Sequence, residues 1–310
     1  MTKILITGAA GYIGSLLVPK LLELGHHVTC VDTLMYEPTS LMIPSTHKNC
    51  KLIIGDARDK ELMKPLIEDS DVIIPLACMT GAPLCNKDKI AASTVNRDSI
   101  VMCSKFSSKN QLLIYPCTNS GYGIGEEGIF CTEESPLNPI SLYGKLKVEA
   151  ERILLDKGNA ITFRLATVFG ISPRPRLDLL VNDFTYRAFF DKTVVLFEAD
   201  FKRNYLHIED AADGFRFAIK NPKLAGNCFN LGYSEANLSK RELCEEIKNI
   251  IPDFVYLISE IGTDIDKRNY IVSNEKIEKA GFKATRDLST GIKELIKALP
   301  LLKRTQFANI

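Results

Sequence analysis

The strongest chemical signal in the sequence is a tyrosine followed four positions later by a lysine, Tyr143 and Lys147. In a helix this spacing places both side chains on one face. A free phenol has a pKa of about 10 and is a poor base at neutral pH, but a nearby ammonium group favours the phenolate. A phenolate can take a hydroxyl proton while the carbon of that hydroxyl gives up a hydride. Thr118, at the end of an apolar segment, is expected to hydrogen-bond the same oxygen.

A glycine-rich turn at the start of the chain predicts a dinucleotide site. Gly8, Gly11 and Gly14 lie between an apolar segment and a segment of helical periodicity. Gly8 permits a tight turn, Gly11 lets the backbone approach a pyrophosphate, and Gly14 lets the helix pack closely. The free amides at the start of the helix then hold the phosphate charge. A glycine-rich turn without a ligand is the alternative.

Two aspartates follow the next strands that the pattern predicts. Asp32 is placed to accept hydrogen bonds from the adenosine ribose, and it would repel a 2′-phosphate, so it favours NAD over NADP. Asp56 follows the third expected strand, where an adenine ring would lie and where its amino group could donate to the carboxylate. A helix N-cap role for Asp56 or Asp59 is the competing interpretation.

Short apolar segments alternate with helical segments over the first half of the chain. This rhythm predicts an α/β fold with a doubly wound parallel sheet of the Rossmann type, covered by helices on both faces. The expected strands are 3–7, 28–31, 52–54, 72–75, 112–115 and 161–165. The expected helices are 13–24, 61–68, 96–107 and 142–156. Beyond residue 165 the rhythm breaks, and the pattern indicates a smaller mixed region with helices at 179–190, 209–219 and 240–250 and a short strand at 194–197. The segments 229–232, 274–280 and 288–299 complete this region.

Composition and charge exclude several function classes. Lys and Arg total 39 against 38 Asp and Glu, so the net charge of +1 gives no reason to expect a nucleic-acid or membrane partner. The nine cysteines show no metal-ligand spacing and lie mostly in apolar segments, which is typical of reduced thiols in the cytoplasm. No metal site is expected. We also expect no signal peptide and no transmembrane segment.

The motifs together carry a family resemblance. TGAAGYIG, Asp32, GDARD, CTNSGYG, YGKLK and FKRNYLHIED resemble the extended short-chain dehydrogenase/reductases that act on nucleotide-activated sugars. The resemblance implies an NAD cofactor and a Thr118, Tyr143 and Lys147 triad. It also implies a cofactor site formed by Gly8, Gly11, Tyr12, Ile13, Gly14, Asp32, Asp56, Ala57, Leu76, Ala77, Tyr143 and Lys147. Asn96 matches an asparagine on the first helix of the subunit interface in this family.

The same resemblance divides the chain into two domains. Residues 1–165, with about 203–220, are expected to bind NAD. Residues of about 166–202 and 221–310 are expected to form a smaller C-terminal mixed α/β domain that binds the nucleotide sugar.

The residues after Thr118 bear on the reaction. Dehydratases of this family place acidic residues directly after the threonine, but Asn119 and Ser120 stand there and cannot act as carboxylic acids or bases. Members that epimerise C3 and C5 have a cysteine where this chain has Gly121. Hydride removal at C4 is left, giving either a 4-dehydrogenase or a 4-epimerase. Overall likeness favours GDP-manno-heptose 4-dehydrogenases of capsule or surface polysaccharide synthesis.

Several polar residues are expected to contact the substrate. The resemblance puts Arg203 and Arg268 near the diphosphate, because forked guanidinium groups suit phosphate oxygens. The other candidates are Thr118, Asn119, Arg174, Arg176 and Asn182. A salt bridge is the alternative for each arginine. Thr167 replaces an asparagine found in many sugar epimerases, and His207 is expected to be structural.

Two expectations concern assembly and class. By resemblance, the helices expected at 96–107 and 142–156 form a homodimer or higher homo-oligomer, since Ile100, Val101, Phe106, Leu146, Ile153 and Leu154 cover more than one face. Packing within one chain is the alternative. A non-catalytic NAD-binding sensor is the alternative to an enzyme.

Overall fold

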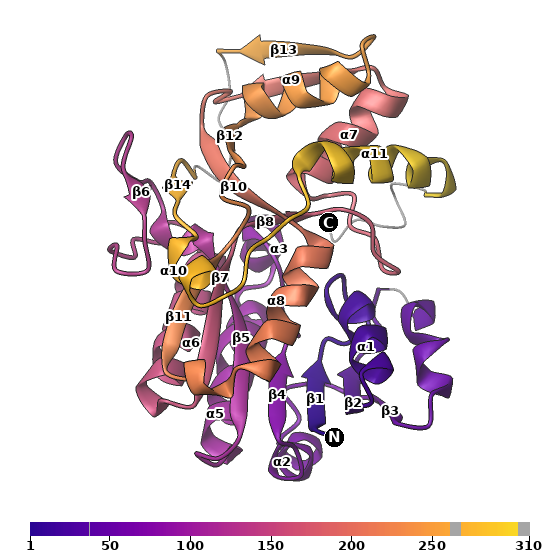
Figure 1. Ribbon diagram of the computed structural model, residues 1–310, viewed down its shortest axis with the longest axis vertical. Coiled ribbons are helices and arrows are strands. Elements are labelled where there is room, and N and C mark those ends of the chain that lie inside the picture. Colours follow the sequence, from indigo (N-terminus) through magenta and orange to yellow (C-terminus); the bar gives the residue numbers. More distant parts are fainter. Residues whose placement is uncertain (37, 261–267, 303–310) are drawn as a thin grey trace.

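A seven-stranded parallel sheet forms the larger part of the molecule (Figure 1). The computed structural model describes residues 1–36, 38–260 and 268–302. In sheet order the strands are β11 (Asn227–Leu231), β7 (Ala160–Leu165), β5 (Leu112–Thr118), β4 (Val72–Pro75), β1 (Lys3–Thr7), β2 (His27–Asp32) and β3 (Cys50–Ile54). The expected α/β fold with a large parallel sheet is confirmed.

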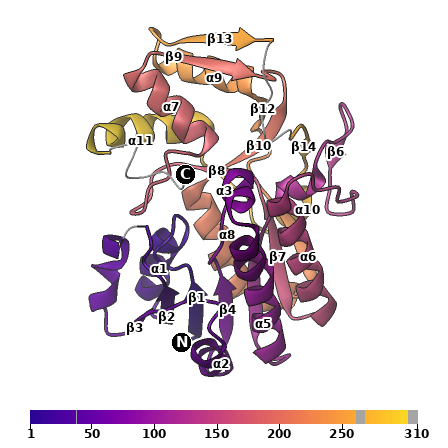
Figure 2. The ribbon, with the colours of Figure 1, turned by 180° about the vertical axis from the view of Figure 1, so that it is seen from behind.

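Helices cover both faces of this sheet because alternate residues of its strands point to opposite sides. Ile4 and Ile6 of β1 pack with α1 (Gly14–Glu23) and α8 (Ile208–Lys220), which stand in front of the sheet in Figure 1. Leu5, between them, packs on the other side. Figure 2 shows that side, where the helices α2 (Lys60–Glu68), α5 (Ser99–Phe106) and α6 (Leu142–Lys157) lie.

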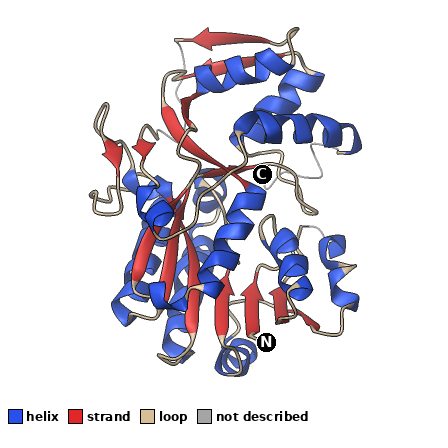
Figure 3. Cartoon of the chain, in the orientation of Figure 1, coloured by secondary structure: helices blue, strands red, loops and turns tan. Residues whose placement is uncertain are grey.

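A smaller region with its own core lies beyond the carboxyl ends of the strands (Figure 3). Its sheets are short: β12 (Asn237–Ser239), β10 (Lys202–His207) and β8 (Thr167–Phe169) form one, and β13 (Val255–Ser259) pairs with β9 (Thr193–Phe197). Its helices are α7 (Leu180–Phe190), α9 (Lys240–Ile250) and α11 (Leu288–Ala298).

The boundary between the two regions differs from the expected one. Strand β11 lies in the part assigned to the second domain, yet it pairs with β7 and extends the large sheet. Strand β10 was expected in the first domain but pairs with β8 and β12 of the smaller region. The second domain was also expected to include 261–267 and 303–310, which lie outside the described residues.

The remaining elements are short. A helical segment after β4 consists of α3 (Ala82–Lys87), α4 (Lys89–Ser93) and a π-helical turn (Thr94–Asp98) that leads into α5. The others are β6 (Phe130–Cys131), β14 (Ile271–Val272), α10 (Glu275–Lys279) and the 3-10 turns 38–41, 44–46, 119–122, 222–224 and 299–301. Within the described ranges, no helix has the length and apolar character needed to cross a membrane.

Candidate active site

The predicted site residues gather at the carboxyl edge of the large sheet. The glycine turn follows β1, Asp32 ends β2 and Thr118 ends β5. In open parallel sheets, ligands bind at this edge, beside the point where the strand order reverses. That point lies here between β1 and β4.

The backbone of the glycine turn leaves no room for side chains. Gly8 has a φ of 68°, and a Cβ built there would lie 2.5 Å from the Ala77 backbone nitrogen. A Cβ on Gly14 would lie 2.5 Å from the Ala9 carbonyl oxygen. Gly14 therefore lets α1 start against the turn itself rather than against the strand. This close approach of backbone to backbone fits a cradle for a dinucleotide.

The Asp32 carboxylate fixes the glycine turn. Its Oδ2 accepts a hydrogen bond of 2.9 Å from the Ala10 amide, and its Oδ1 accepts one of 2.9 Å from the Leu34 amide. A carboxylate offers about four lone-pair positions. The remaining ones are available to ribose hydroxyls.

The competition between Asp56 and Asp59 for the N-cap is resolved. Asp59 caps α2 by accepting hydrogen bonds from the amides of Glu61 and Leu62. Asp56 instead holds Arg58, and the hydrogen bonds from Arg58 lower the pKa of the Asp56 carboxyl group. Asp56 is thus kept charged, and it does not serve as the N-cap of α2.

A chain of polar contacts lies directly after β5. The Thr118 hydroxyl lies 3.0 Å from the Ser120 hydroxyl, which accepts a hydrogen bond of 2.7 Å from Nη1 of Arg268. Arg268 was expected near the diphosphate, but in this structure it contacts the loop that carries Thr118. The sequence could not show this contact because Arg268 and Ser120 lie 148 positions apart in the chain.

Two polar residues that follow neighbouring strand ends have buried hydrogen-bonding atoms without a partner among the described residues. Asn119 is 1% exposed, and neither its amide nitrogen nor its oxygen is paired. The Thr167 hydroxyl is in the same state. Thr118 is in register with Leu165 on the adjacent strand, so Asn119 and Thr167 follow neighbouring strand ends. Buried polar groups normally have partners, so this capacity points to a ligand.

Helix α6 brings Tyr143 and Lys147 to the end of β5. Ser141 caps the helix by accepting from the Gly144 amide, and small residues allow a close approach. A Cβ on Gly144 would lie 3.3 Å from the Ser120 carbonyl oxygen, and one on Gly121 would lie 2.8 Å from Val148. The ammonium group of Lys147, which is only 3% exposed, lies 4.1 Å from the centre of the Tyr115 ring. This contact stabilises the buried cation.

The pKa of Tyr143 differs from the expectation. Burial raises the pKa of the phenol well above its usual value, the thiol groups of Cys78 and Cys117 raise it further, and Arg268 is the neighbour that lowers it. The sequence predicts a pKa lowered by Lys147, but loss of hydration outweighs the nearby cations. Among the described residues, none hydrogen-bonds the Tyr143 hydroxyl.

A buried hydrogen-bond network between α6 and the large sheet was not predicted from the sequence. Glu151 accepts hydrogen bonds from Arg164 Nε at 3.0 Å and from the Thr162 hydroxyl at 2.8 Å. Arg164 also donates to the Tyr122 hydroxyl, which donates to Asn230 at 2.6 Å. A signal was present, because Glu151 shares the helix face of Lys147 and Arg164 interrupts an apolar strand.

Three residues expected at the substrate have partners within the chain. Asn182, 1% exposed, accepts from the Gly170 amide at 3.0 Å and donates to the Arg176 carbonyl oxygen at 2.8 Å. Arg176 forms an ion pair with Asp178. The Arg174 guanidinium lies 4.6 Å from the centre of the Tyr36 ring. A fourth residue expected at the substrate, Arg203, is buried on β10.

These contacts belong to a loop that packs on the glycine turn. The Tyr12 hydroxyl donates to the Gly170 carbonyl oxygen at 2.7 Å, and the Ser172 hydroxyl donates to the Tyr12 carbonyl oxygen at 2.7 Å. Ser172 also lies 2.9 Å from the Ser15 hydroxyl on α1. The smaller region is therefore joined to the turn by buried hydrogen bonds.

Three further expectations can be placed. Ile100, Leu146 and Leu154 are buried within the chain, so they contribute to its own core. His207 caps α8 and contacts Glu294, in line with a structural role. Asn96 is buried and pairs with both backbone groups of Met79 in the loop after β4.

Comparison with known proteins decides the family. Residues 4–232 match the model of the NAD dependent epimerase/dehydratase family. The chain belongs to this family. It is 28% identical to a UDP-glucose 4-epimerase of Streptococcus mutans, over 92% of each chain. It is 27% identical to the low-salt glycan biosynthesis protein Agl12 of Haloferax volcanii, over 79% of this chain and 81% of that protein.

A solved structure confirms the fold. The dTDP-glucose 4,6-dehydratase of Bacillus anthracis in complex with NAD superposes with a TM-score of 0.82 at 22% identity, over 96% of each chain. As a member of the NAD dependent epimerase/dehydratase family, the chain is an NAD-dependent enzyme. The crowded turn at Gly8 and Gly14 and the Asp32 carboxylate fit this cofactor.

Proposed function

We propose that this enzyme oxidises C4 of a nucleotide-activated sugar to a 4-keto sugar. The observation that carries the proposal is the loop after β5, where Thr118 lies beside α6 with Tyr143 and Lys147, and Asn119 and Ser120 replace acids. When bound, NAD supplies the hydride acceptor. Tyr143 takes the C4 hydroxyl proton through its phenolate form, and Thr118 orients that oxygen. Burial raises the pKa of Tyr143, so the phenolate is the minor form, and the positive charges of Lys147 and Arg268 favour it.

The sugar-binding side of the proposal rests on unpaired polar groups. Asn119 and Thr167 offer a donor and acceptors to sugar hydroxyls from neighbouring strand ends. Arg268, beside Ser120, and Arg203 supply positive charge to the same site. Since Arg176 and Asn182 are engaged within the chain, we assign them to holding the loop at 170–182.

The nucleotide and the sugar are proposed from overall likeness. GDP-manno-heptose is the first substrate to test, with capsule or surface polysaccharide as the destination of the product. A 4-epimerase is the second candidate, because a UDP-glucose 4-epimerase matches over 92% of the chain. The two differ only in whether the ketone leaves or takes the hydride back on its other face.

The test separates the candidates by mass. The purified protein is incubated with GDP-, UDP-, dTDP- and CDP-sugars, and the nucleotide released on denaturation is analysed. NADH with a product two mass units lighter supports the dehydrogenase. An unchanged mass with a new retention time identifies an epimerase. A loss of eighteen mass units would contradict the inference from Asn119 and Ser120, and no reaction with any sugar nucleotide would favour a sensor.

A further inference from the structure

Arg58 holds the carboxylate that is expected to meet the adenine ring. Its Nε lies 3.0 Å from Oδ1 of Asp56, and its Nη2 lies 2.5 Å from Oδ2. The Arg58 backbone amide also donates to Oδ1, at 2.8 Å. A forked pair of this kind fixes the plane of the carboxylate as well as its place.

The Asp56 carboxylate retains capacity for one more donor. The backbone amide of Arg58 donates to Oδ1, Nη2 donates to Oδ2, and Nε shares its hydrogen between Oδ1 at 3.0 Å and Oδ2 at 3.1 Å. A carboxylate offers about four lone-pair positions, so these three N–H groups leave capacity for one more donor. The Asp56 side chain is 37% exposed, so the carboxylate is accessible to a ligand.

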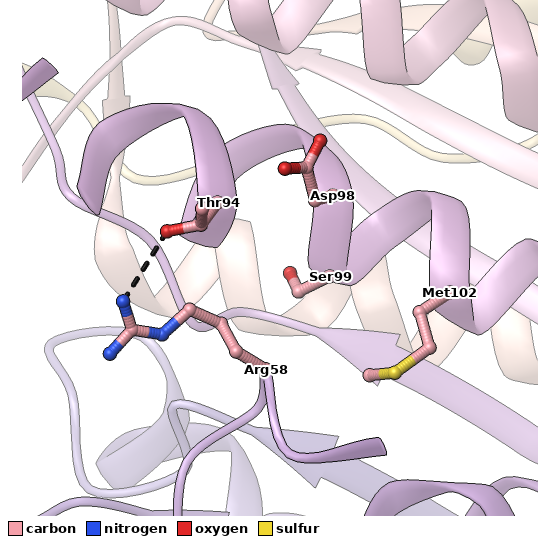
Figure 4. Close-up of a pocket in the computed structure, with 5 residues that line it drawn as sticks. All are labelled: Arg58, Thr94, Asp98, Ser99 and Met102. Carbon is pink, nitrogen blue, oxygen red and sulfur yellow. Dashed lines mark hydrogen bonds between the residues drawn. The ribbon is translucent and has the colours of Figure 1, made fainter. Parts of the chain in front are cut away.

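Arg58 also links this loop to the π-helical turn (Figure 4). Its Nη1 donates to the Thr94 hydroxyl at 3.3 Å, and Thr94 begins the turn. Asn96 in the same turn pairs with the Met79 amide at 2.8 Å and its carbonyl oxygen at 2.9 Å. Met79 belongs to the loop that begins with Leu76 and Ala77. π-helical turns occur often at functional sites.

The space beside the guanidinium group is open. A cavity of about 390 Å³ is lined by Arg58, Thr94, Asp98, Ser99 and Met102. If a shorter side chain replaced Arg58, water and not a packed neighbour would therefore fill the space that the guanidinium group leaves. The link between the two loops depends on Arg58 itself.

We propose that Arg58 is a positioning residue for adenine recognition, which orients Asp56 toward the adenine amino group and ties this loop through Thr94 to the loop on the nicotinamide side. The inference rests on the proposed adenine contact of Asp56. It makes Arg58 a determinant of selectivity for the amino-bearing base. Arg58 itself touches no reacting atom.

Competition between two dinucleotides tests the inference. The full-length protein, freed of nucleotide, is loaded from an equimolar mixture of NAD and deamino-NAD, in which a keto oxygen replaces the amino group. Bound dinucleotides are counted after desalting and denaturation. One hydrogen bond of ordinary strength corresponds to about tenfold in an equilibrium constant. Arg58→Met is therefore expected to lower the bound ratio of NAD to deamino-NAD about tenfold, and Arg58→Lys less.

The controls separate this inference from its premise. Arg97→Met removes an arginine that pairs with Asp98 and Glu149, and it should leave the ratio unchanged. If Asp56→Asn removes the preference for NAD but Arg58→Met does not, Arg58 has no positioning role. If the wild-type protein binds both dinucleotides equally, the proposed contact between Asp56 and the adenine amino group is wrong, and the inference about Arg58 is wrong with it. The ratio is read within the folded, loaded protein, so a loss of stability does not imitate the effect.

Discussion

Two loops at the same edge of the molecule use polar residues in opposite ways. The loop at 118–122 has buried hydrogen-bonding atoms without a partner among the described residues, namely those of Asn119. In the loop at 170–182, Asn182 and Arg176 are paired within the chain. The first arrangement leaves free energy to be gained when a substrate binds, whereas the second has already gained it on folding. The comparison separates binding residues from residues that only shape the site.

The largest effect on turnover is expected at Tyr143, on the helix beside the loop at 118–122. Tyr143→Phe removes the proposed proton acceptor, and positioned acid–base groups contribute about 10²–10⁴-fold to rates. Turnover should fall by about 10³-fold with NAD content unchanged, as measured by product formation and by nucleotide release. Tyr256→Phe is the matched control, since the Tyr256 hydroxyl donates to Glu245 in an exposed part of the smaller region and should leave turnover unchanged. Equal turnover of Tyr143→Phe and wild type would remove Tyr143 from the chemistry.

The next effect should appear in folding. Asn182→Leu leaves the Gly170 amide and the Arg176 carbonyl oxygen unpaired in a buried place. Each such loss costs about 1–3 kcal/mol, so the free energy of unfolding should fall by about 3 kcal/mol in chemical denaturation. The KM of the protein that remains folded should stay close to wild type. A large rise in KM without loss of stability would show that Asn182 contacts substrate after all.

Asn119→Leu should show the reverse pattern. The side chain has no partner to lose, so the free energy of unfolding should stay the same or rise. The KM for the sugar nucleotide should rise about tenfold, the equivalent of one hydrogen bond. Steady-state kinetics and denaturation of the same preparation measure both quantities. Destabilisation with normal KM would place Asn119 with the structural residues.

The smallest effect is a shift along the pH axis. Burial raises the pKa of Tyr143, so turnover should increase as pH rises and the phenolate fraction grows. Arg268 lowers this pKa, hence Arg268→Met should move the rise in turnover to higher pH. The kcat profile at saturating substrate measures the shift. Arg241→Met, which breaks a surface pair with Asp200, is the control and should leave the profile in place.

The same comparison explains what the sequence could predict. Most strands of the large sheet are continuous apolar segments, so they could be located from the sequence. Strands β10 and β11 mix polar with apolar residues, and their partners depend on contacts far along the chain. Tyr143 and Lys147 were recognisable because their spacing has chemical meaning. Asn182 was not, because an amide side chain serves a ligand or a backbone equally well. Only the three-dimensional contacts show that Gly170 and Arg176 occupy it.

The network behind α6 has a consequence for how such enzymes diverge. Tyr143, Lys147 and Glu151 share one helix face, and Arg164, Tyr122 and Asn230 hold that face from the large sheet and the turn after β5. The contacts that fix the position of α6 therefore come from the larger region, which contains the seven-stranded sheet. Exchange of segments in the smaller region should therefore alter which sugar is accepted without moving the tyrosine and lysine. A chimera that keeps residues 1–165 and 208–231, which include helix α8 on the large sheet, can inherit the oxidation step and acquire a new specificity.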